Sequence, residues 1–243
     1  MIKQHIPNAL TMLNLLCGVL GIICCINGEI YAVPVLIAIA LVADFLDGFV
    51  ARALNVKSEL GKQLDSLADC VTFGVLPGII LLFLFQANSN GILGFSILRP
   101  TIAFSAFLYP IFAAMRLGIF NIDTRQATTF IGLPTPAGAM FVVGLLLTYL
   151  MKSPGMTEWV TNPIMLVITS IALAFLMVSP IPMFSLKMNF KNWKENKVQI
   201  IFLIIAVISI IILKEVALPF IMLVYIAIGI ASYLFGKDVP LIN

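Results

Sequence analysis

The chain has 243 residues, of which 61% are hydrophobic and only 10% are charged, and its formal net charge is +3. Its mean hydropathy is +1.12. Because soluble domains carry about 25% charged residues, this composition excludes an ordinary water-soluble protein, and the small net charge does not indicate nucleic-acid binding. Apolar stretches of about 20 residues, the length needed to cross a bilayer, recur along the whole chain. We therefore predict an all-α, polytopic bundle of transmembrane helices.

Short segments of turn-forming or charged residues divide the apolar sequence into eight predicted spans. These cover residues 9–27, 32–54, 61–86, 100–121, 134–151, 162–178, 198–214 and 216–235. The last two are separated only by Lys214-Glu215, which requires a tight reversal.

The basic residues are distributed unevenly between the two sides of this arrangement. Lys and Arg accumulate in the cytoplasmic loops of membrane proteins. One side carries Lys3, Arg52, Lys57, Lys62, Arg116, Arg125, Lys187, Lys191, Lys194, Lys197 and Lys237. The other side carries only Arg99, Lys152 and Lys214. This bias predicts that both termini lie in the cytoplasm.

Acidic residues are concentrated in one part of the chain, where four of the six aspartates fall between residues 44 and 69. Ionisable side chains inside membrane spans are costly and usually mark a functional site. The full string reads Asp44-x-x-Asp47-Gly48-x-x-Ala51-Arg52, then eight residues, then Gly61-x-x-x-Asp65-x-x-x-Asp69.

Helical spacing places these carboxylates on two helix faces. Asp44 and Asp47 share one face of the second span, and Asp65 and Asp69 share one face of the third. The short connection 53–60 makes the two helices antiparallel neighbours, so the acidic faces meet near the cytoplasmic surface. Facing carboxylates repel unless cations lie between them, and oxygen ligands suit hard divalent ions. We therefore expect two metal ions, Mg²⁺ or Mn²⁺, at these four aspartates.

Small and basic residues accompany the carboxylates. Gly48 and Ala51 leave room for a ligand to approach the helix backbone, and Arg52 offers a guanidinium group to phosphate oxygens. Together with the metals they indicate a site that handles a pyrophosphate. Two other interpretations stay open: the aspartates serve as caps and the small residues as helix contacts, or the protein is a cation transporter. Neither accounts for the whole string.

At all eight of its specified positions, this string resembles the signature of the CDP-alcohol phosphatidyltransferases. The resemblance implies that Asp44, Asp47 and Asp65 bind the metals with help from Asp69, which also acts as the general base. It further implies a CDP site at three positions of the second span, with Gly61 allowing close packing at the start of the third. These CDP positions are Gly48, Ala51 and Arg52.

Further segments are similar to one branch of the family, the phosphatidylserine synthases of bacteria and archaea. They are Ile6-Pro7-Asn8-Ala9-Leu10-Thr11, Asp65-Ser66-Leu67-Ala68-Asp69 to Phe73-Gly74, Gly132-Leu133-Pro134-Thr135-Pro136-Ala137, and Met177-Val178-Ser179 to Ser185-Leu186-Lys187. The likeness implies that Asn8 and Thr11 contact the nucleotide, although either residue also suits a helix N-cap. The segment 132–137 either begins the fifth span or lines a serine pocket.

One position departs from this branch. The branch often has Arg-Leu-Ala-Arg-Phe-Asn on the fourth span, where this chain has Arg116-Leu117-Gly118-Ile119-Phe120-Asn121. If the second arginine of that motif helps to hold the serine carboxylate, Ile119 weakens the assignment of serine. Arg116 and Lys187 remain candidates for binding the acceptor. Arg116 also suits a helix end at the membrane surface, and Lys187 a topology-determining charge.

The resemblance implies an enzyme that transfers the phosphatidyl group of CDP-diacylglycerol to L-serine and releases CMP. A second possibility keeps this chemistry with glycerol 3-phosphate or an inositol phosphate as acceptor. We expect a catalytic helix bundle over residues 1–190 and two further helices of the same membrane domain over 191–243. The expected location is a prokaryotic cytoplasmic membrane with the site facing the cytoplasm, and the resemblance suggests a homodimer.

Overall fold

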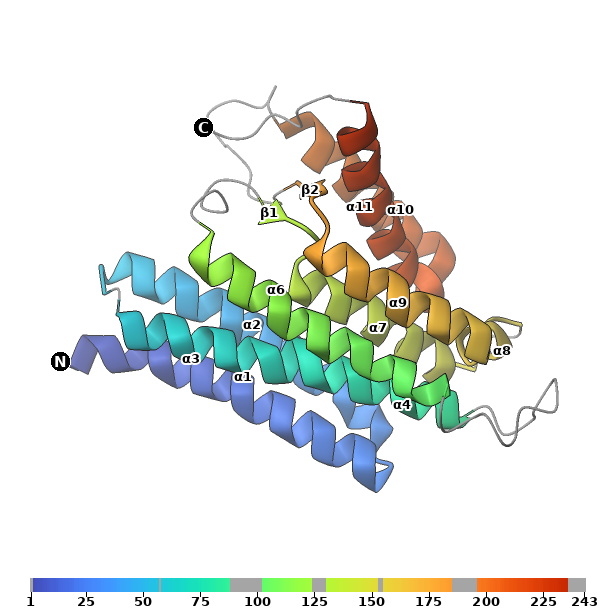
Figure 1. Cartoon of the computed structure of the whole chain (residues 1–243), viewed down its shortest axis with the longest axis horizontal. Helices are drawn as coiled ribbons and strands as arrows, with labels where there is room; N and C mark the ends of the chain where they lie inside the picture. Colours follow the sequence, from blue (N-terminus) through green and yellow to red (C-terminus); the bar gives the residue numbers. More distant parts are fainter. Residues whose placement is uncertain are drawn as a thin grey trace.

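The computed structural model describes residues 2–56, 58–87, 102–123, 130–152, 155–184 and 196–235. Its helices pack side by side as an antiparallel bundle (Figure 1). The α-helices are α1 (Ile2–Asn27), α2 (Val33–Ala53), α3 (Glu59–Asp69), α4 (Leu76–Ala87), α6 (Leu108–Ile122), α7 (Thr135–Leu150), α8 (Met156–Val160), α9 (Pro163–Val178), α10 (Lys197–Leu213) and α11 (Ala217–Leu234). Short 3₁₀ turns precede α2, α6 and α11, namely η1 (Ile30–Ala32), η3 (Phe104–Phe107) and η6 (Lys214–Val216).

Apart from single residues at their ends, the described residues of all eight predicted spans are helical, with α3, η2 and α4 together forming the third, so the prediction of an α-helical membrane bundle is confirmed. Within the described part of the chain, five helical segments are long and apolar enough to cross a bilayer. Three further apolar helices, α7, α9 and α10, are shorter, with 16, 16 and 17 residues. The count of eight spans and the orientation of the termini therefore remain predictions.

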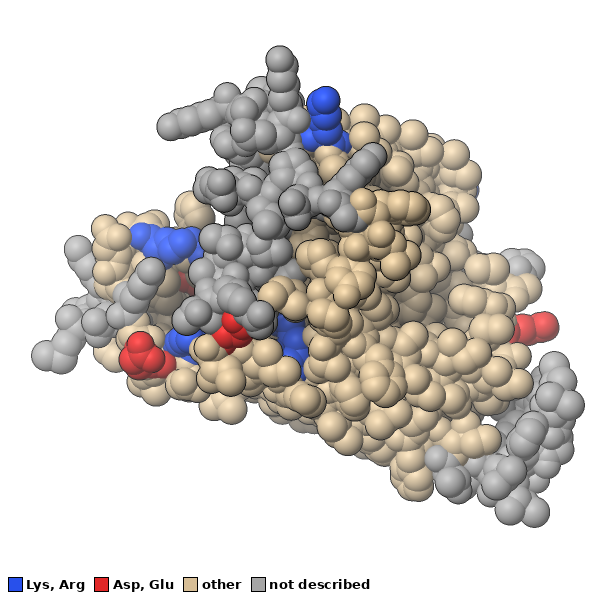
Figure 2. Space-filling view, turned by 45° about the horizontal axis from the view of Figure 1, so that its top comes forward, with Lys and Arg blue, Asp and Glu red and all other residues tan. Residues whose placement is uncertain are grey.

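The outer surface of the bundle suits a lipid environment. Large apolar side chains such as Phe45, Phe175, Ile204 and Ile211 are exposed, and an apolar surface of this extent is unfavourable in water. On the face shown in Figure 2, most charged side chains gather at one end of the molecule, and uncharged residues cover most of the remainder. This separation is typical of a protein whose flanks face lipid and whose end faces water.

The third helical segment changes its winding beside the acidic residues. Between α3 and α4 the chain forms the π-helix η2 (Cys70–Val75), directly after Asp69. Single π-helical turns often occur at functional sites. Here α1 approaches η2 closely at Gly18, which has no side chain. A Cβ at this position would lie 2.9 Å from Thr72 Cα. Small residues at helix contacts allow such packing in membranes.

A two-stranded antiparallel pair joins distant parts of the bundle. Strand β1 (Phe130–Ile131) pairs with β2 (Pro182–Met183), with Phe130 opposite Met183 and Ile131 opposite Pro182. In Figure 1 the pair lies between the α6–α9 part of the bundle and α11. The sequence did not indicate these strands, which are only two residues long.

Candidate metal and nucleotide site

The turn between α2 and α3 is fixed by backbone geometry at both ends. Asn55 has a φ of +53°, and Val56 N–H donates to Ala51 C=O at 3.0 Å. This is the Schellman ending of a helix, in which asparagine tolerates the left-handed conformation. Ser58 then caps α3, where its Oγ accepts a hydrogen bond from Gly61 N–H at 2.9 Å. The short turn sets α2 and α3 antiparallel, as the spacing predicts, but the main packing of both helices is against α1 and not against each other.

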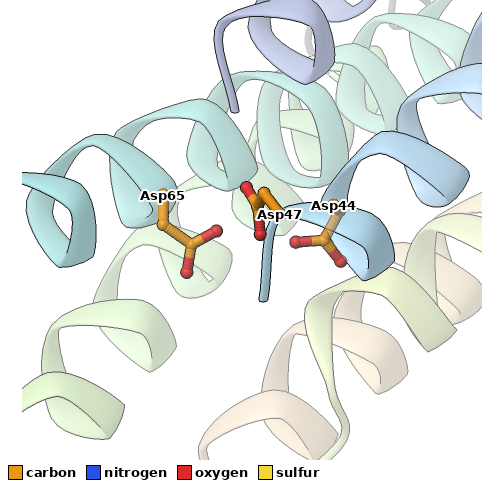
Figure 3. Close-up of side chains that lie close together, drawn as sticks. All are labelled: Asp44, Asp47 and Asp65. Atoms are coloured by element: carbon orange, nitrogen blue, oxygen red, sulfur yellow. The ribbon is translucent and has the colours of Figure 1, made fainter. Parts of the chain in front are cut away.

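Three of the four aspartates meet between these helices. Each of Asp44, Asp47 and Asp65 offers one carboxylate oxygen, and these oxygens lie within 4.8 Å of one another. Figure 3 shows the side chains from α2 and α3 turned toward one another. Oδ1 of Asp65 is buried and has no hydrogen-bond partner among the described residues. A cluster of oxygen ligands with an unsatisfied buried oxygen fits a hard divalent cation.

Thr11 orients one of these carboxylates. The residue is only 3% exposed, and its hydroxyl lies 2.5 Å from Asp47 Oδ2 and 3.1 Å from the carbonyl oxygen of Pro7. Because α1 already begins at Ile2, the interpretation of Thr11 or Asn8 as a helix N-cap is wrong. Both residues lie inside α1 and face the α2–α3 turn.

A cavity of about 440 Å³ opens beside the carboxylates. Its lining contains most of the residues that the resemblance assigns to CDP. The lining residues are Pro7, Asn8, Thr11, Asp47, Gly48, Ala51, Val56, Ser58, Glu59, Gly61, Lys62 and Asp65.

The glycines keep this cavity open. A Cβ at Gly61 would lie 2.9 Å from Ser58 Oγ and 3.2 Å from Asn8 Oδ1. A Cβ at Gly48 would lie 3.3 Å from the Arg52 guanidinium. Arg52 itself is exposed and is not among the lining residues, so its side chain folds back along α2 at the edge of the cavity.

Asp69 is held apart from the three-carboxylate cluster. It is 9% exposed, and Asn14 Nδ2 donates to its Oδ1 at 3.0 Å. Asn14 is itself fixed, since Thr72 Oγ1 of η2 donates to its backbone carbonyl at 3.0 Å. Asp69 interacts electrostatically with Asp44 and Asp65 and also with the buried Arg116. It is therefore close enough to both the carboxylate cluster and a buried cation to interact with each.

Arg116 is buried in the bundle and is not a surface residue of a helix end. It is 6% exposed, its Nη1 lies 3.4 Å from Thr135 Oγ1, and its guanidinium stands 5.1 Å from the centre of the Phe120 ring. Its Nε has no hydrogen-bond partner among the described residues. A buried cation with a free donor is suited to bind an anionic group. The second candidate, Lys187, falls outside the described residues.

Sequence reasoning missed Asn14 and Ser58. Asn14 continues a pattern, because Asn8, Thr11 and Asn14 recur every third residue within an apolar span. Polar side chains at this spacing share one helix face, which was a usable signal. For Ser58, the only signal in the sequence was a serine shortly before the predicted third span, a position typical of a helix N-cap.

A sequence model of the family described as CDP-alcohol phosphatidyltransferase matches residues 4–180, which include the carboxylate cluster, the cavity, Asp69 and Arg116. The chain belongs to the CDP-alcohol phosphatidyltransferase family.

Curated members of this family are similar over most of the chain. A Bacillus subtilis protein named CDP-diacylglycerol–serine O-phosphatidyltransferase is 36% identical over 197 residues, which cover 79% of this chain and 93% of that protein. A Helicobacter pylori protein of the same name is 34% identical over 232 residues, which cover 94% of this chain and 91% of that protein. A third, from Mycobacterium leprae, is 35% identical over 187 residues, with 74% of this chain and 58% of that protein covered.

Proposed function

We propose that this family member is a CDP-diacylglycerol–serine O-phosphatidyltransferase, which transfers a phosphatidyl group to L-serine and releases CMP. The observation that carries the proposal is the meeting of Asp44, Asp47 and Asp65 beside a cavity lined by the signature residues. The names of the similar proteins support serine as the acceptor.

The nucleotide is proposed to lie in the α1–α2–α3 cavity. Asn8 and Thr11 offer polar groups, while Gly48, Ala51 and Gly61 leave the backbone accessible to it. Arg52 stands at the edge of this cavity, where its guanidinium can pair with phosphate oxygens. The pyrophosphate then lies beside the carboxylate cluster.

The aspartates bind divalent cations in this proposal, with two Mg²⁺ or Mn²⁺ ions at Asp44, Asp47 and Asp65 and with help from Asp69. When bound, the metal offsets negative charge on the pyrophosphate and on the departing CMP. Thr11 holds Asp47 in its ligating orientation.

Asp69 is the proposed general base. It takes the proton of the serine hydroxyl, and the serine oxygen forms a bond to the phosphorus that carries diacylglycerol. The bond from that phosphorus to the bridging oxygen breaks, and CMP leaves with the electron pair. Because a hydroxyl is a weak nucleophile at neutral pH, both the base and the positioning of the acceptor contribute to the rate.

Arg116 is the proposed partner of the serine carboxylate, with Lys187 as a further candidate. Arg116 interacts electrostatically with Asp69 and does not line the nucleotide cavity, which supports this assignment, since the acceptor must reach the base from outside that cavity. The contact of Thr135 with Arg116 supports a role for segment 132–137 in the same proposed pocket. Because Ile119 occupies the position where the branch often has a second arginine, the proposed acceptor pocket has one basic group fewer.

The test is CMP release by the purified protein in detergent, with CDP-diacylglycerol fixed and the acceptor varied. We expect L-serine to support release far better than glycerol 3-phosphate or inositol phosphates, with phosphatidylserine identified by mass spectrometry. A phosphorylated alcohol as the better acceptor would contradict the serine assignment but keep the family chemistry. Cation flux in proteoliposomes without CMP release from any acceptor would favour a transporter.

The location and assembly belong to the same proposal. The site faces the cytoplasm of a prokaryotic cell, with both termini on that side, as the distribution of Lys and Arg supports. Residues 1–190 form the catalytic bundle, residues 191–243 add two helices, and the enzyme is a homodimer. Labelling of single cysteines by an impermeant reagent tests the orientation, and light scattering in detergent tests the dimer.

A further inference from the structure

The last helix of the chain contacts a segment that leads to Thr135 and Arg116. On α11, the Tyr225 hydroxyl donates to the Phe184 backbone carbonyl at 3.1 Å. The two rings lie 4.8 Å apart, and Phe202 of α10 packs on both, at 5.5 and 5.9 Å between ring centres. Gly229, one turn after Tyr225, lets α11 approach β2, because a Cβ there would lie 2.6 Å from Met183 Sδ.

Strand β2 in turn fixes the start of α7. It pairs with β1, and the ladder continues where Gly132 N–H donates to Ile181 C=O at 2.9 Å. Gly132 has a φ of +77°, and a Cβ there would collide with the carbonyl oxygen of Met177, so this turn requires glycine. Leu133 N–H donates to Leu176 C=O at 2.9 Å. The backbone that leads into Thr135 is therefore held by the segment around β2.

Thr135 closes the connection to Arg116. It is fully buried, and its hydroxyl contacts the Arg116 guanidinium. Arg116 interacts electrostatically with Asp69 and also with Tyr225, so the α11 tyrosine lies near the same buried cation. Tyr225 is not among the residues that line the nucleotide cavity.

We propose that Tyr225 is a positioning residue of the acceptor pocket, which fixes β2 and through it Thr135 and Arg116. The inference rests on the proposed function and assigns to α11 a role in acceptor binding, although α11 lies beyond the residues that the family model matches. Loss of the hydroxyl leaves the Phe184 carbonyl buried without its partner, which loosens the strand pair. The effect falls on the acceptor pocket because the nucleotide cavity lies on α1, α2 and α3.

The test compares Tyr225→Phe with the wild-type protein in detergent. This variant keeps the ring and its aromatic contacts and removes only the donor. A buried hydrogen bond of this kind corresponds to a change of about three- to tenfold, and we expect the KM for L-serine to rise by that factor. The KM for CDP-diacylglycerol should stay within about twofold, since a single bond outside that cavity is altered. Tyr233→Phe, on the exposed face of α11, is the matched control and should change neither KM.

A double-mutant cycle shows whether the effect passes through Thr135. In a Thr135→Val background, Tyr225→Phe should raise the serine KM little further, whereas its effect should be retained in an Asn8→Ala background. Gly229→Ala crowds Met183 of β2 from the same helix through a different contact and should produce the same selective rise, so the inference can be tested even if Tyr225→Phe fails to fold. A serine KM unchanged by these variants, or equal rises in both KM values, would overturn the inference. If the wild-type protein itself releases no CMP with serine, the proposed function fails instead.

Discussion

Asn14 of α1 donates a hydrogen bond of 3.0 Å to Asp69 at the end of α3, and both side chains are buried. The two residues are 55 positions apart in the chain. Because Asn14 is fixed to η2 through Thr72, this contact sets the orientation of the Asp69 carboxylate. One Asp69 oxygen is then engaged by Asn14, and the other is the proposed acceptor of the serine proton.

Replacing Asn14 by alanine should lower kcat with little change in either KM. Hydrogen bonds to charged groups contribute about 1.5–3 kcal/mol, so the expected loss in kcat is about 10- to 100-fold. Steady-state CMP release measures it. Asn162→Ala is the matched control, because Asn162 caps α9 through Ile164 N–H and its loss should lower stability without lowering kcat. A variant at Asn14 with the wild-type kcat would refute a role in orienting Asp69.

Asp69→Asn should retain the shape of the side chain and one ligand oxygen but lose the ability to accept a proton. A positioned base contributes roughly 10²–10⁴-fold, and kcat should fall by about that factor. Lipid binding should change far less, since Asp69 does not line the nucleotide cavity. Titration with Mn²⁺ distinguishes the two roles. If normal turnover returns at high Mn²⁺, Asp69 is chiefly a metal ligand.

Removal of divalent cations by EDTA should abolish CMP release, and Mg²⁺ or Mn²⁺ should restore it. Asp44→Ala and Asp65→Ala should lose metal binding and activity together, because each removes an oxygen from the cluster. Isothermal titration with Mn²⁺ measures the first effect. Glu158→Gln, which alters an acidic residue on α8, should bind Mn²⁺ like the wild type. Full activity in a metal-free preparation would contradict the metal proposal.

Gly61→Ala should raise the KM for CDP-diacylglycerol more than the KM for serine. The added Cβ would lie 2.9 Å from Ser58 Oγ and 3.2 Å from Asn8 Oδ1, at the wall of the cavity. Gly118→Ala provides the control, since a Cβ at Gly118 meets nothing within 4 Å. Equal KM values in both variants would show that the α1–α3 cavity does not hold the nucleotide.

Arg116→Ala and Arg52→Ala should separate the two substrates. Loss of the buried Arg116 guanidinium should raise the KM for serine, while loss of the exposed Arg52 should raise that for CDP-diacylglycerol. We expect the Arg116 effect to be the larger, about 10-fold or more, because a desolvated charge–charge contact is stronger than a solvated one. Kinetics with each substrate varied in turn measure both. The reverse pattern would exchange the two assignments.

The sequence determined the helical class of the protein and the acidic cluster. Aspartates three and four residues apart lie on one face of a helix whatever surrounds it, and a short turn with Asn55 and Ser58 leaves α2 and α3 no arrangement but an antiparallel one. Local geometry thus brought Asp44, Asp47 and Asp65 together. The apolar lengths likewise located the helices, five of which are long enough for a full span within the described residues.

Only the tertiary structure decided what Asp69, Arg116 and Tyr225 contact. Their partners lie on other helices, and helices that are apolar all round carry no stripe that fixes their rotation against a neighbour. In a bilayer that rotation follows from close packing at small residues and from buried polar contacts, such as Gly18 against Thr72 and Asn14 with Asp69. For this reason the sequence located the carboxylates of the site, while the orientation of the base and the acceptor pocket emerged from the packing of α1, α6, α7 and α11.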